Sequence, residues 1–327
     1  MVVVTGAAGF IGSALVAECN RRGRSSLLLV DQLGGDQRFR NLCGLAFADF
    51  CPTDEFLARV ERDRGLPRLE AVIHLGACSA TTEPDGDFLM RNNFAYTCTL
   101  AEWCLRHGVR FIYASSAATY GDGELGYSDE PALLPRLRPR NKYALSKHAF
   151  DLWALRHGAF GKGGIAGLKY FNVYGPNEYH KGEMRSMALK AFEQVRAEGR
   201  VRLFQSHRED FAHGEQNRDF LYVLDAVAMT LWFLDHPEAA GVFNIGCGAA
   251  RTWNALAGAV FRAMGVEPAI EYVPMPEAIR PAYQYATCAD LGRLRAAGCT
   301  LQPRSLEEGV KDYVQNYLMG PDPYLRP

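Results

Sequence analysis

Short apolar runs alternate with segments of helical spacing through the first half of the chain. The apolar runs lie at 2–4, 27–30, 45–48, 71–75 and 110–114, and apolar residues recur at helical intervals over 13–22 and 93–107. A strand that is apolar at every position is typical of a parallel sheet covered by helices on both faces. Because crossovers between parallel strands are right-handed, the pattern predicts an α/β fold with a Rossmann-like doubly wound parallel sheet.

The second half is less regular and predicts a smaller α/β lobe that binds the substrate. Proline and glycine become frequent after Gly175, and the strand-like runs at 242–245 and 270–273 are short. The predicted Rossmann domain is 1–171, to which 217–240 returns, and the predicted substrate-binding lobe is 172–216 with 241–327. No long linker separates the lobes, so we expect them to pack together. The segment 319–327 is rich in Pro and Gly and is expected to be peripheral.

Bulk composition narrows the class of protein. Hydrophobic residues make up 48% and charged residues 22%, as in an ordinary globular enzyme. A net charge of -1 gives no basic field for nucleic acid or an anionic membrane. No apolar run reaches membrane-spanning length, and the run at 1–4 is too short for a signal peptide. The nine cysteines form no Cys-x-x-Cys pair or zinc spacing, which predicts reduced thiols, a cytoplasmic protein and no metal site.

A glycine-rich turn joins the first apolar run to the first predicted helix. Gly6 would allow the tight turn, Gly9 would let a pyrophosphate approach the helix N-terminus, and Gly12 would let helix and strand pack closely. The spacing Gly-x-x-Gly-x-x-Gly differs from the Gly-x-Gly-x-x-Gly of ordinary dinucleotide domains. Asp31 ends the second apolar run about twenty residues later, where a ribose-binding acid belongs. The order of these features predicts a dinucleotide site rather than a turn without a ligand.

The choice between NAD and NADP stays open from these residues. Asp31 alone favours NAD, because a carboxylate binds ribose hydroxyls and repels a 2′-phosphate. Arg38 lies a few residues further and would neutralise that phosphate, unless it is only a solvated loop charge.

Candidate acid–base residues follow in the order that a hydride-transfer site requires. Ser116 lies at the end of an apolar run, and Tyr143 and Lys147 are four residues apart, on one face of a predicted helix. A nearby ammonium and an oxidised nicotinamide both favour the phenolate, so Tyr143 is a candidate base with Ser116 holding the substrate oxygen. A lone Tyr-x-x-x-Lys occurs often by chance, but here it follows both the glycine turn and the Ser-Ser strand end.

These motifs give the chain a resemblance to a known family. It resembles the extended short-chain dehydrogenase/reductases and, along almost its whole length, is similar to their ADP-glycero-manno-heptose epimerases. The glycine, Ser-Ser and Tyr-x-x-x-Lys motifs mark only the superfamily. The segments that carry the closer resemblance include HLGACSATTE, YASSAATYG, NKYALSKHAFDLW, KYFNVYGPNEYHKGEMRSM, LFQSHREDFAHGEQNRDFLYV, FNIGCG and YQYATCADL.

The resemblance implies an NADP-dependent enzyme that acts on a nucleotide sugar as a homo-oligomer, a pentamer in the family. Implied catalytic residues are Ser116, Tyr143, Lys147 and Lys181. Implied cofactor-binding residues are Gly6, Gly9, Phe10, Ile11, Gly12, Asp31, Gln32, Arg38, Asp49, Asn92, Tyr143 and Lys147. Implied substrate-binding residues are Ser116, Asn172, His180, Lys181, Phe204, Arg218 and Tyr283. Two positions depart from the family pattern, since Ala144 replaces a frequent Gly and Thr53 stands where some members carry a second lysine for the 2′-phosphate.

The chemistry that the resemblance implies is epimerisation at C6 of the heptose. Simple deprotonation at that carbon would be far too slow, because no carbonyl lies beside it, so hydride is removed and then returned to the other face. A 4,6-dehydratase needs an acid and a base at Ala117 and Ala118, and neither residue can transfer a proton. A UDP-hexose 4-epimerase and a non-catalytic NADP-sensing module stay open as alternatives, although the Lys181 segment and the intact Tyr143 set weigh against them.

Overall fold

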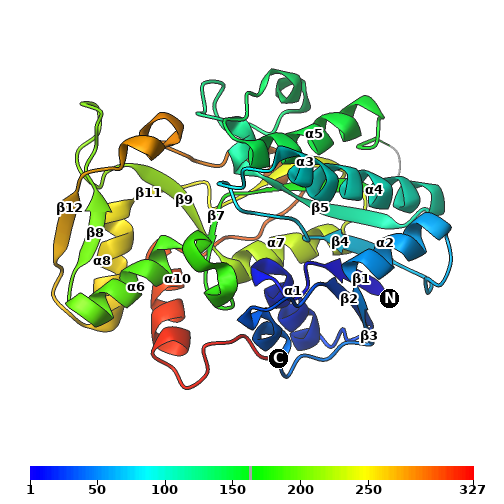
Figure 1. Cartoon of the computed structure of the whole chain (residues 1–327), viewed down its shortest axis with the longest axis horizontal. Coiled ribbons are helices and arrows are strands. Elements are labelled where there is room, and N and C mark those ends of the chain that lie inside the picture. Colours follow the sequence, from blue (N-terminus) through cyan, green and yellow to red (C-terminus); the bar gives the residue numbers. More distant parts are fainter. Residues whose placement is uncertain (162–163) are drawn as a thin grey trace.

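The computed structural model describes residues 1–161 and 164–327, and its main element is a seven-stranded sheet flanked by helices (Figure 1). The strand order is β10-β6-β5-β4-β1-β2-β3, and every neighbouring pair is parallel. The order reverses at β1, so the predicted doubly wound topology is confirmed. The strands are β1 (Val2–Thr5), β2 (Leu27–Asp31), β3 (Asp49–Pro52), β4 (Ala71–His74), β5 (Arg110–Ser116), β6 (Ile165–Tyr170) and β10 (Gly241–Ile245).

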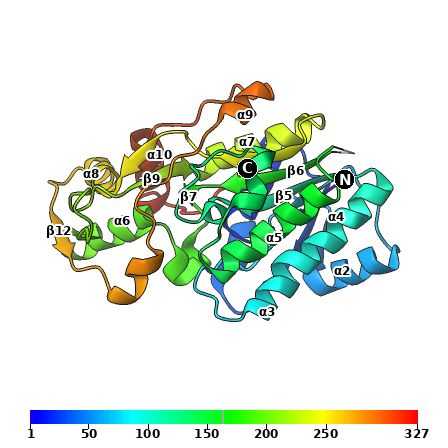
Figure 2. The same cartoon turned by 90° about the horizontal axis from the view of Figure 1, so that it is seen from above.

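Helices cover both faces of this sheet, because its strands are apolar at successive positions. Val2 and Val4 of β1 join the core beneath α1 (Phe10–Arg21) and α7 (Val223–Asp235), which pack against each other. Val3, between them in sequence, joins the opposite core. That core lies beneath α2 (Thr53–Arg62), α4 (Tyr96–His107) and α5 (Lys142–Arg156), which Figure 2 shows together on one side.

A smaller lobe lies beside the carboxyl ends of the large sheet's strands (Figure 1). It contains a three-stranded sheet of β7 (Asn172–Tyr174), β9 (Asn217–Tyr222) and β11 (Ala250–Thr252). A parallel pair, β8 (Val201–Phe204) with β12 (Ile270–Val273), forms its outer edge. Helices α6 (Met187–Glu198), α8 (Trp253–Met264) and α10 (Leu306–Asp312) pack around these strands, with α8 against both of the others. The remaining helices include α3 (Gly86–Leu89) and α9 (Gly292–Ala296).

The path of the chain between the lobes differs from the predicted boundaries. The strand at 241–245, which the sequence assigns to the substrate lobe, pairs with β6 as an edge strand of the large sheet. The segment 217–240 returns to the large sheet only in part, since α7 packs on α1 whereas β9 pairs with β7 and β11. The partner of a strand can be far away in the sequence, and the partner's identity leaves no periodic signal in the strand itself. The apolar pattern therefore could not show where the chain passes from one lobe to the other.

The strand predicted at 45–48 is wrong by four residues, because β3 begins at Asp49. Of the apolar run only Leu45 is buried, whereas Phe47 is 39% exposed. β3 lies at the sheet edge with β2 as its single neighbour, and an edge strand does not require apolar side chains on both faces.

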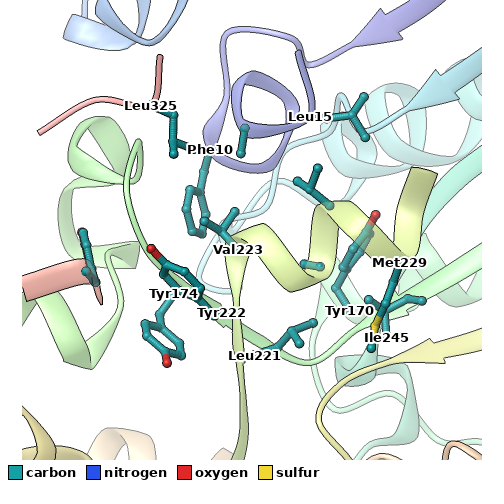
Figure 3. Close-up of a cluster of buried hydrophobic side chains, with 14 of the residues drawn as sticks. Phe10, Leu15, Tyr170, Tyr174, Leu221, Tyr222, Val223, Met229, Ile245 and Leu325 are labelled. Atoms are coloured by element: carbon teal, nitrogen blue, oxygen red, sulfur yellow. The ribbon is translucent and has the colours of Figure 1, made fainter. Parts of the chain in front are cut away.

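The segment 319–327 is not peripheral throughout. The Leu325 side chain is buried in the core that contains Phe10 of α1, and Figure 3 shows the two residues close together. The Leu325 N–H donates to Asn177 Oδ1 at 2.9 Å, and the Arg326 guanidinium donates to the Cys43 carbonyl. No helix in the described part of the chain combines the length and the apolar character needed to cross a membrane.

Candidate active site

Two adjoining cavities lie where the smaller lobe meets the carboxyl ends of the large sheet. One, of about 520 Å³, is lined by the glycine turn, and the other, of about 710 Å³, extends into the smaller lobe. Residues that line both cavities mark their junction, and they are Ser79, Ser116, Tyr143, Tyr170, Phe171, Val173, Lys181 and Met184. The predicted groups Ser116, Tyr143 and Lys181 therefore share one region of the cleft.

The glycine turn of the first cavity fits a dinucleotide pyrophosphate. Gly6 has a φ of +68°, and a Cβ there would lie 2.6 Å from the Gly76 nitrogen. A Cβ on Gly12 would overlap the Gly6 carbonyl oxygen. Helix α1 begins at Phe10, and no side chain caps it at Gly9, so its first N–H groups face the cavity as an anion site.

Asp31 and Arg38 lie together at the end of this cavity where a ribose would bind. Asp31 is buried and accepts hydrogen bonds from the N–H of Ala8 at 2.8 Å and of Gln32 at 2.7 Å. Burial raises the pKa of Asp31, and these donors oppose that rise. Arg38 Nη1 lies 3.8 Å from Asp31 Oδ1, while its guanidinium makes a second ion pair with Asp36 at 2.7 Å. The charge that would bind a 2′-phosphate is thus present and shared between two carboxylates.

Ser116, Tyr143 and Lys147 meet at the floor of the cleft. Asn141 caps α5 through a 2.8 Å bond from the Ala144 N–H, which places Tyr143 and Lys147 one turn apart on the buried face. Burial raises the pKa of Tyr143, and a hydrogen bond to Ser116 opposes that rise. The Lys147 ammonium donates to the Ala114 carbonyl at 2.9 Å, and burial lowers its pKa to about 8. Lys147 therefore still carries a proton at neutral pH.

Lys181 approaches the same junction from the opposite lobe. It lies on the 3₁₀ helix η5 (Tyr179–Met184), and its Nζ is 5.1 Å from the centre of the Phe10 ring. Burial lowers the pKa of Lys181, and the carboxylate of Glu178 opposes this. Glu178 itself is fully buried and accepts a 2.7 Å hydrogen bond from the Ser186 hydroxyl.

The predicted substrate residues divide between three positions. Asn172, Phe204 and Tyr283 line the larger cavity, as do Ser116 and Lys181. His180 lines the smaller, glycine-turn cavity, where its Nδ1 is 3.3 Å from Asn41 Nδ2. Arg218 lines neither cavity. It is buried behind the larger one, with its guanidinium 5.5 Å from the Trp253 ring and 5.2 Å from the Tyr283 ring.

Nine of the twelve predicted cofactor residues line the smaller cavity, and three do not: Gln32, Asp49 and Asn92. Asp49 is exposed on the edge strand β3, and Gln32 approaches the site only through its backbone, whose N–H binds Asp31. The Asn92 amide donates to Asn93 Oδ1 at 2.9 Å, and Asn93 in turn binds both the backbone of Cys78 and the hydroxyl of Ser146.

The larger cavity also has lining residues that the sequence did not single out. Three are cations: Arg185 and Lys190, which follow the turn that carries Lys181, and Arg202 of β8. Trp253 and Gln284 come from distant segments, and only the fold brings them to this wall. The sequence held a signal for two of them. Arg185 lies inside the segment KYFNVYGPNEYHKGEMRSM, which carries the family resemblance, and Lys190 lies three residues after its end. In 1–161 and 164–327, no three His, Cys, Asp or Glu side chains converge as a metal site would require.

Comparison with known proteins shows which family the chain is similar to. Residues 2–246 match the model of the NAD dependent epimerase/dehydratase family. The chain is 52% identical, over 325 residues, to an ADP-L-glycero-D-manno-heptose-6-epimerase of Nitratidesulfovibrio vulgaris, covering 99% of this chain and 100% of that protein.

The chain is also similar in structure to solved epimerases. The heptose epimerase of Helicobacter pylori superposes with a TM-score of 0.81 at 26% identity, covering 96% of this chain and 95% of that one. The UDP-glucose 4-epimerase of Thermus thermophilus, solved with NAD, has a TM-score of 0.74 at 26% identity, covering 96% and 97% of the two chains.

Proposed function

The chain belongs to the NAD dependent epimerase/dehydratase family, and from this premise we propose that it is an NADP-dependent ADP-L-glycero-D-manno-heptose 6-epimerase. The reaction interconverts the D-glycero and L-glycero forms of the nucleotide sugar, for the supply of lipopolysaccharide core heptose. The observation that carries the proposal is the pairing of Tyr143 and Lys181 at one junction. Epimerisation needs a proton-transfer group for each face of a transient ketone, and these two come from opposite lobes.

NADP, held by the glycine turn, Asp31 and Arg38, would supply the hydride acceptor and donor that oxidation of C6 to a ketone and reduction on its other face require. Tyr143 takes the hydroxyl proton while Ser116 holds the same oxygen, since the two side chains are hydrogen-bonded. The Lys147 ammonium lies one turn away on α5, and a positive charge near the phenol would favour the phenolate. Tyr143 then serves one face of the ketone as a general acid and base.

Lys181 serves the other face. Burial lowers its pKa from the ordinary value, which brings an amine closer to the neutral range where it can both give and accept a proton. The Phe10 ring beneath its ammonium keeps water from that side. The larger cavity beyond Lys181 would then receive the nucleotide, with Asn172, Phe204 and Tyr283 on its walls. Arg185 and Lys190 also line this cavity, and a diphosphate would compete for them with their ion-pair partners Glu193 and Glu183.

NADP rather than NAD is proposed because Arg38 lines the cofactor cavity beside Asp31. An arginine at this position neutralises a 2′-phosphate, whereas Asp31 alone would favour the free ribose.

We also expect a cytoplasmic homo-oligomer from the resemblance, and light scattering during size-exclusion chromatography would measure the assembly.

The second candidate is a UDP-hexose 4-epimerase, which the likeness to the Thermus thermophilus enzyme supports. That reaction requires only the Tyr143, Ser116 and Lys147 set. The 52% identity to a heptose epimerase and the position of Lys181 at the junction favour the heptose reaction.

Proton NMR of the purified protein with ADP-D-glycero-D-manno-heptose tests the proposal. Appearance of the L-glycero epimer without added reductant is the expected result. Conversion of UDP-glucose to UDP-galactose with no change in the heptose would favour the second candidate, and retention of cofactor with no turnover of either sugar would favour a sensing module.

A further inference from the structure

A fully buried ion pair lies behind the floor of the cleft and has no part in the mechanism above. Asp151 of α5 and Lys169 of β6 have no exposed side-chain surface, and their charged atoms are 2.7 Å apart. Neither residue lines either of the two cavities. Desolvation offsets most of the attraction in a buried pair, so such a pair is a weak source of stability compared with apolar packing. Its presence here calls for a role other than holding the fold together.

The neighbouring strands β5 and β6 are built around this pair. Tyr113 pairs with Gly167 and Ser115 with Lys169 in the parallel register of β5 and β6. The Tyr113 hydroxyl donates to one carboxylate oxygen of Asp151 at 2.8 Å, and the Ser115 hydroxyl donates to the other at 2.8 Å. A Cβ on Gly167 would overlap the Tyr113 phenol, so glycine is required where that ring crosses β6.

The same pair connects the two elements that carry the proposed catalytic groups. Asp151 is four residues after Lys147 and therefore one turn further along α5. Lys169 Nζ donates to Thr119 Oγ1 at 2.5 Å, and the Thr119 hydroxyl donates to the Ser116 carbonyl at 2.7 Å. A continuous hydrogen-bonded path thus joins the helix of Tyr143 and Lys147 to the turn of Ser116.

Asp151 supplies the negative charge beside two buried ammonium groups behind the floor of the cleft. Lys147 and Lys169 are two buried ammonium groups, and Asp151 is the carboxylate that acts on Lys147 against the effect of burial. His74 and His148 also face these groups, but burial lowers their pKa values to about 3 and about 4, so both are neutral. Other groups in this region include the Cys78 thiol near Lys147, Arg138 near His148, and the Tyr120 ring, whose centre is 5.0 Å from Lys169 Nζ.

We propose that Asp151 and Lys169 are positioning residues, which align Ser116 with Tyr143 and together set the charge around Lys147. The proposal rests on the proposed function, since it assigns the pair to the Tyr143 half of that reaction. A charge role and a packing role predict different outcomes when the two partners are changed one at a time.

The test measures the pH profile of kcat in two single variants. Asp151→Asn removes a negative charge, and both Tyr143 and Lys147 then lose a proton more easily. The acidic limb and the basic limb of the profile should therefore both move to lower pH, by about one unit. Lys169→Met removes a positive charge, so both limbs should move to higher pH. Turnover at the optimum should fall roughly ten- to hundredfold in each variant, because Ser116 is no longer held in line.

Two further variants separate charge from packing. Tyr113→Phe removes one hydrogen bond from Asp151 without changing any charge, so kcat should fall while the limbs stay in place. Asp225→Asn changes a residue of α7 and breaks its ion pair with Arg304; it serves as a matched control, in which neither kcat nor the limbs should change. Unshifted limbs, or shifts of the same sign in Asp151→Asn and Lys169→Met, would overturn the proposal. If Asp151→Asn does not fold, Lys169→Met and Tyr113→Phe still decide it.

A second measurement needs no substrate. NMR of protein labelled with ¹³C at lysine Cε, with the Lys147 signal assigned by Lys147→Arg, follows the ionisation of Lys147 directly. Its midpoint should fall in Asp151→Asn and rise in Lys169→Met. An inactive wild-type protein with these shifts would reject the proposed function and keep the charge role, whereas unchanged midpoints in an active enzyme would reject the charge role alone.

Discussion

Burial lowers the pKa of both Lys147 and Lys181, but their neighbours differ, and the difference fits their separate roles. The Lys147 ammonium donates a hydrogen bond to the Ala114 carbonyl near the end of β5, and this bond holds the positive charge in one position. Lys181 rests on the Phe10 ring and has only the buried Glu178 to oppose the effect of burial on its pKa. A lysine held by a carbonyl suits electrostatic support, whereas one over an aromatic ring is better placed to exchange a proton with a ligand.

Tyr143→Phe removes the ionisable hydroxyl and leaves the ring in place. The ring of Tyr143 is buried at the start of α5, and the substitution keeps this ring and its packing. The fold and cofactor binding should therefore be unchanged. Turnover should fall by about 10²–10⁴, the range for loss of a general acid and base. Single-turnover and steady-state NMR assays measure the loss, and turnover close to that of the wild type would remove Tyr143 from the mechanism.

Lys181→Met separates a second base from a phosphate contact. If Lys181 exchanges a proton with the ketone, kcat should fall strongly while nucleotide affinity changes little. The variant should still dismutate a simpler aldehyde analogue on the face served by Tyr143. Lys190→Met is the matched control, because Lys190 lines the same cavity as a candidate diphosphate contact and should mainly raise KM. A near-normal kcat with a raised KM in Lys181→Met would make Lys181 a binding residue instead.

At the scale of elements, sequence reasoning succeeded where a local signal fixes an end. Asp31 ends β2 as predicted, and Tyr143 and Lys147 lie on a helix because Asn141 caps it. It failed where the deciding contact is distant in sequence. The apolar run at 45–48 looks like a strand until the edge position of β3 is known, and the pairing of β10 with β6 leaves no trace in periodicity.

The same limit explains the candidate site. The residues that line the cleft near the glycine turn were predictable, because their spacing along the chain follows from one strand–turn–helix unit. Arg218 was expected at the substrate, yet Trp253 and Tyr283 lie near it and separate it from the larger cavity. Which of several polar residues faces a cavity depends on packing that no motif encodes.

The segment 322–326 is neither helix nor strand, and its packing against the core could not be predicted from the sequence. Leu325 is buried beside Phe10 (Figure 3). The Tyr179 hydroxyl donates to the Pro323 carbonyl at 2.6 Å. Leu325→Ala should lower the free energy of unfolding by about 2–5 kcal/mol, because it opens a cavity in the core. Denaturant titration measures the change.

Met319→Ala gives the matched control for this segment, since Met319 is 58% exposed and its loss should matter by less than about 0.5 kcal/mol. Equal effects of the two substitutions would show that the segment contributes nothing to the core. A larger effect of Leu325→Ala would show that the segment contributes to the core that contains Phe10.

At the scale of the whole molecule, the chain crosses between lobes several times, so the cleft is bounded by both. The large sheet supplies the glycine turn, Ser116 and Tyr143, whereas β7 and the turn after it supply Lys181. A ligand that fills both cavities therefore binds the folded protein only. Such binding stabilises the whole molecule, by about 2.7 kcal/mol at a ligand concentration of one hundred times Kd.

This linkage gives a measurement of cofactor identity. The purified protein should retain NADP(H), because a redox-neutral cycle does not require its release, and mass analysis after denaturation identifies the nucleotide. Apo protein should gain more thermal stability from NADP than from NAD, since Arg38 lies beside the ribose acid Asp31 at 3.8 Å. The rise in unfolding midpoint with each nucleotide then reports its affinity.

Arg38→Gln should weaken NADP binding by about ten- to hundredfold, the loss expected for a hydrogen bond to a charged group, and leave NAD binding nearly unchanged. Asp36 holds the same guanidinium at 2.7 Å, so the phosphate must compete with this carboxylate for Arg38. Arg40→Gln is the matched control, because Arg40 is exposed on the same turn and does not line the cavity. Retention of NAD alone, or equal losses for both nucleotides in Arg38→Gln, would show that Arg38 does not read a 2′-phosphate and that Asp31 decides the cofactor.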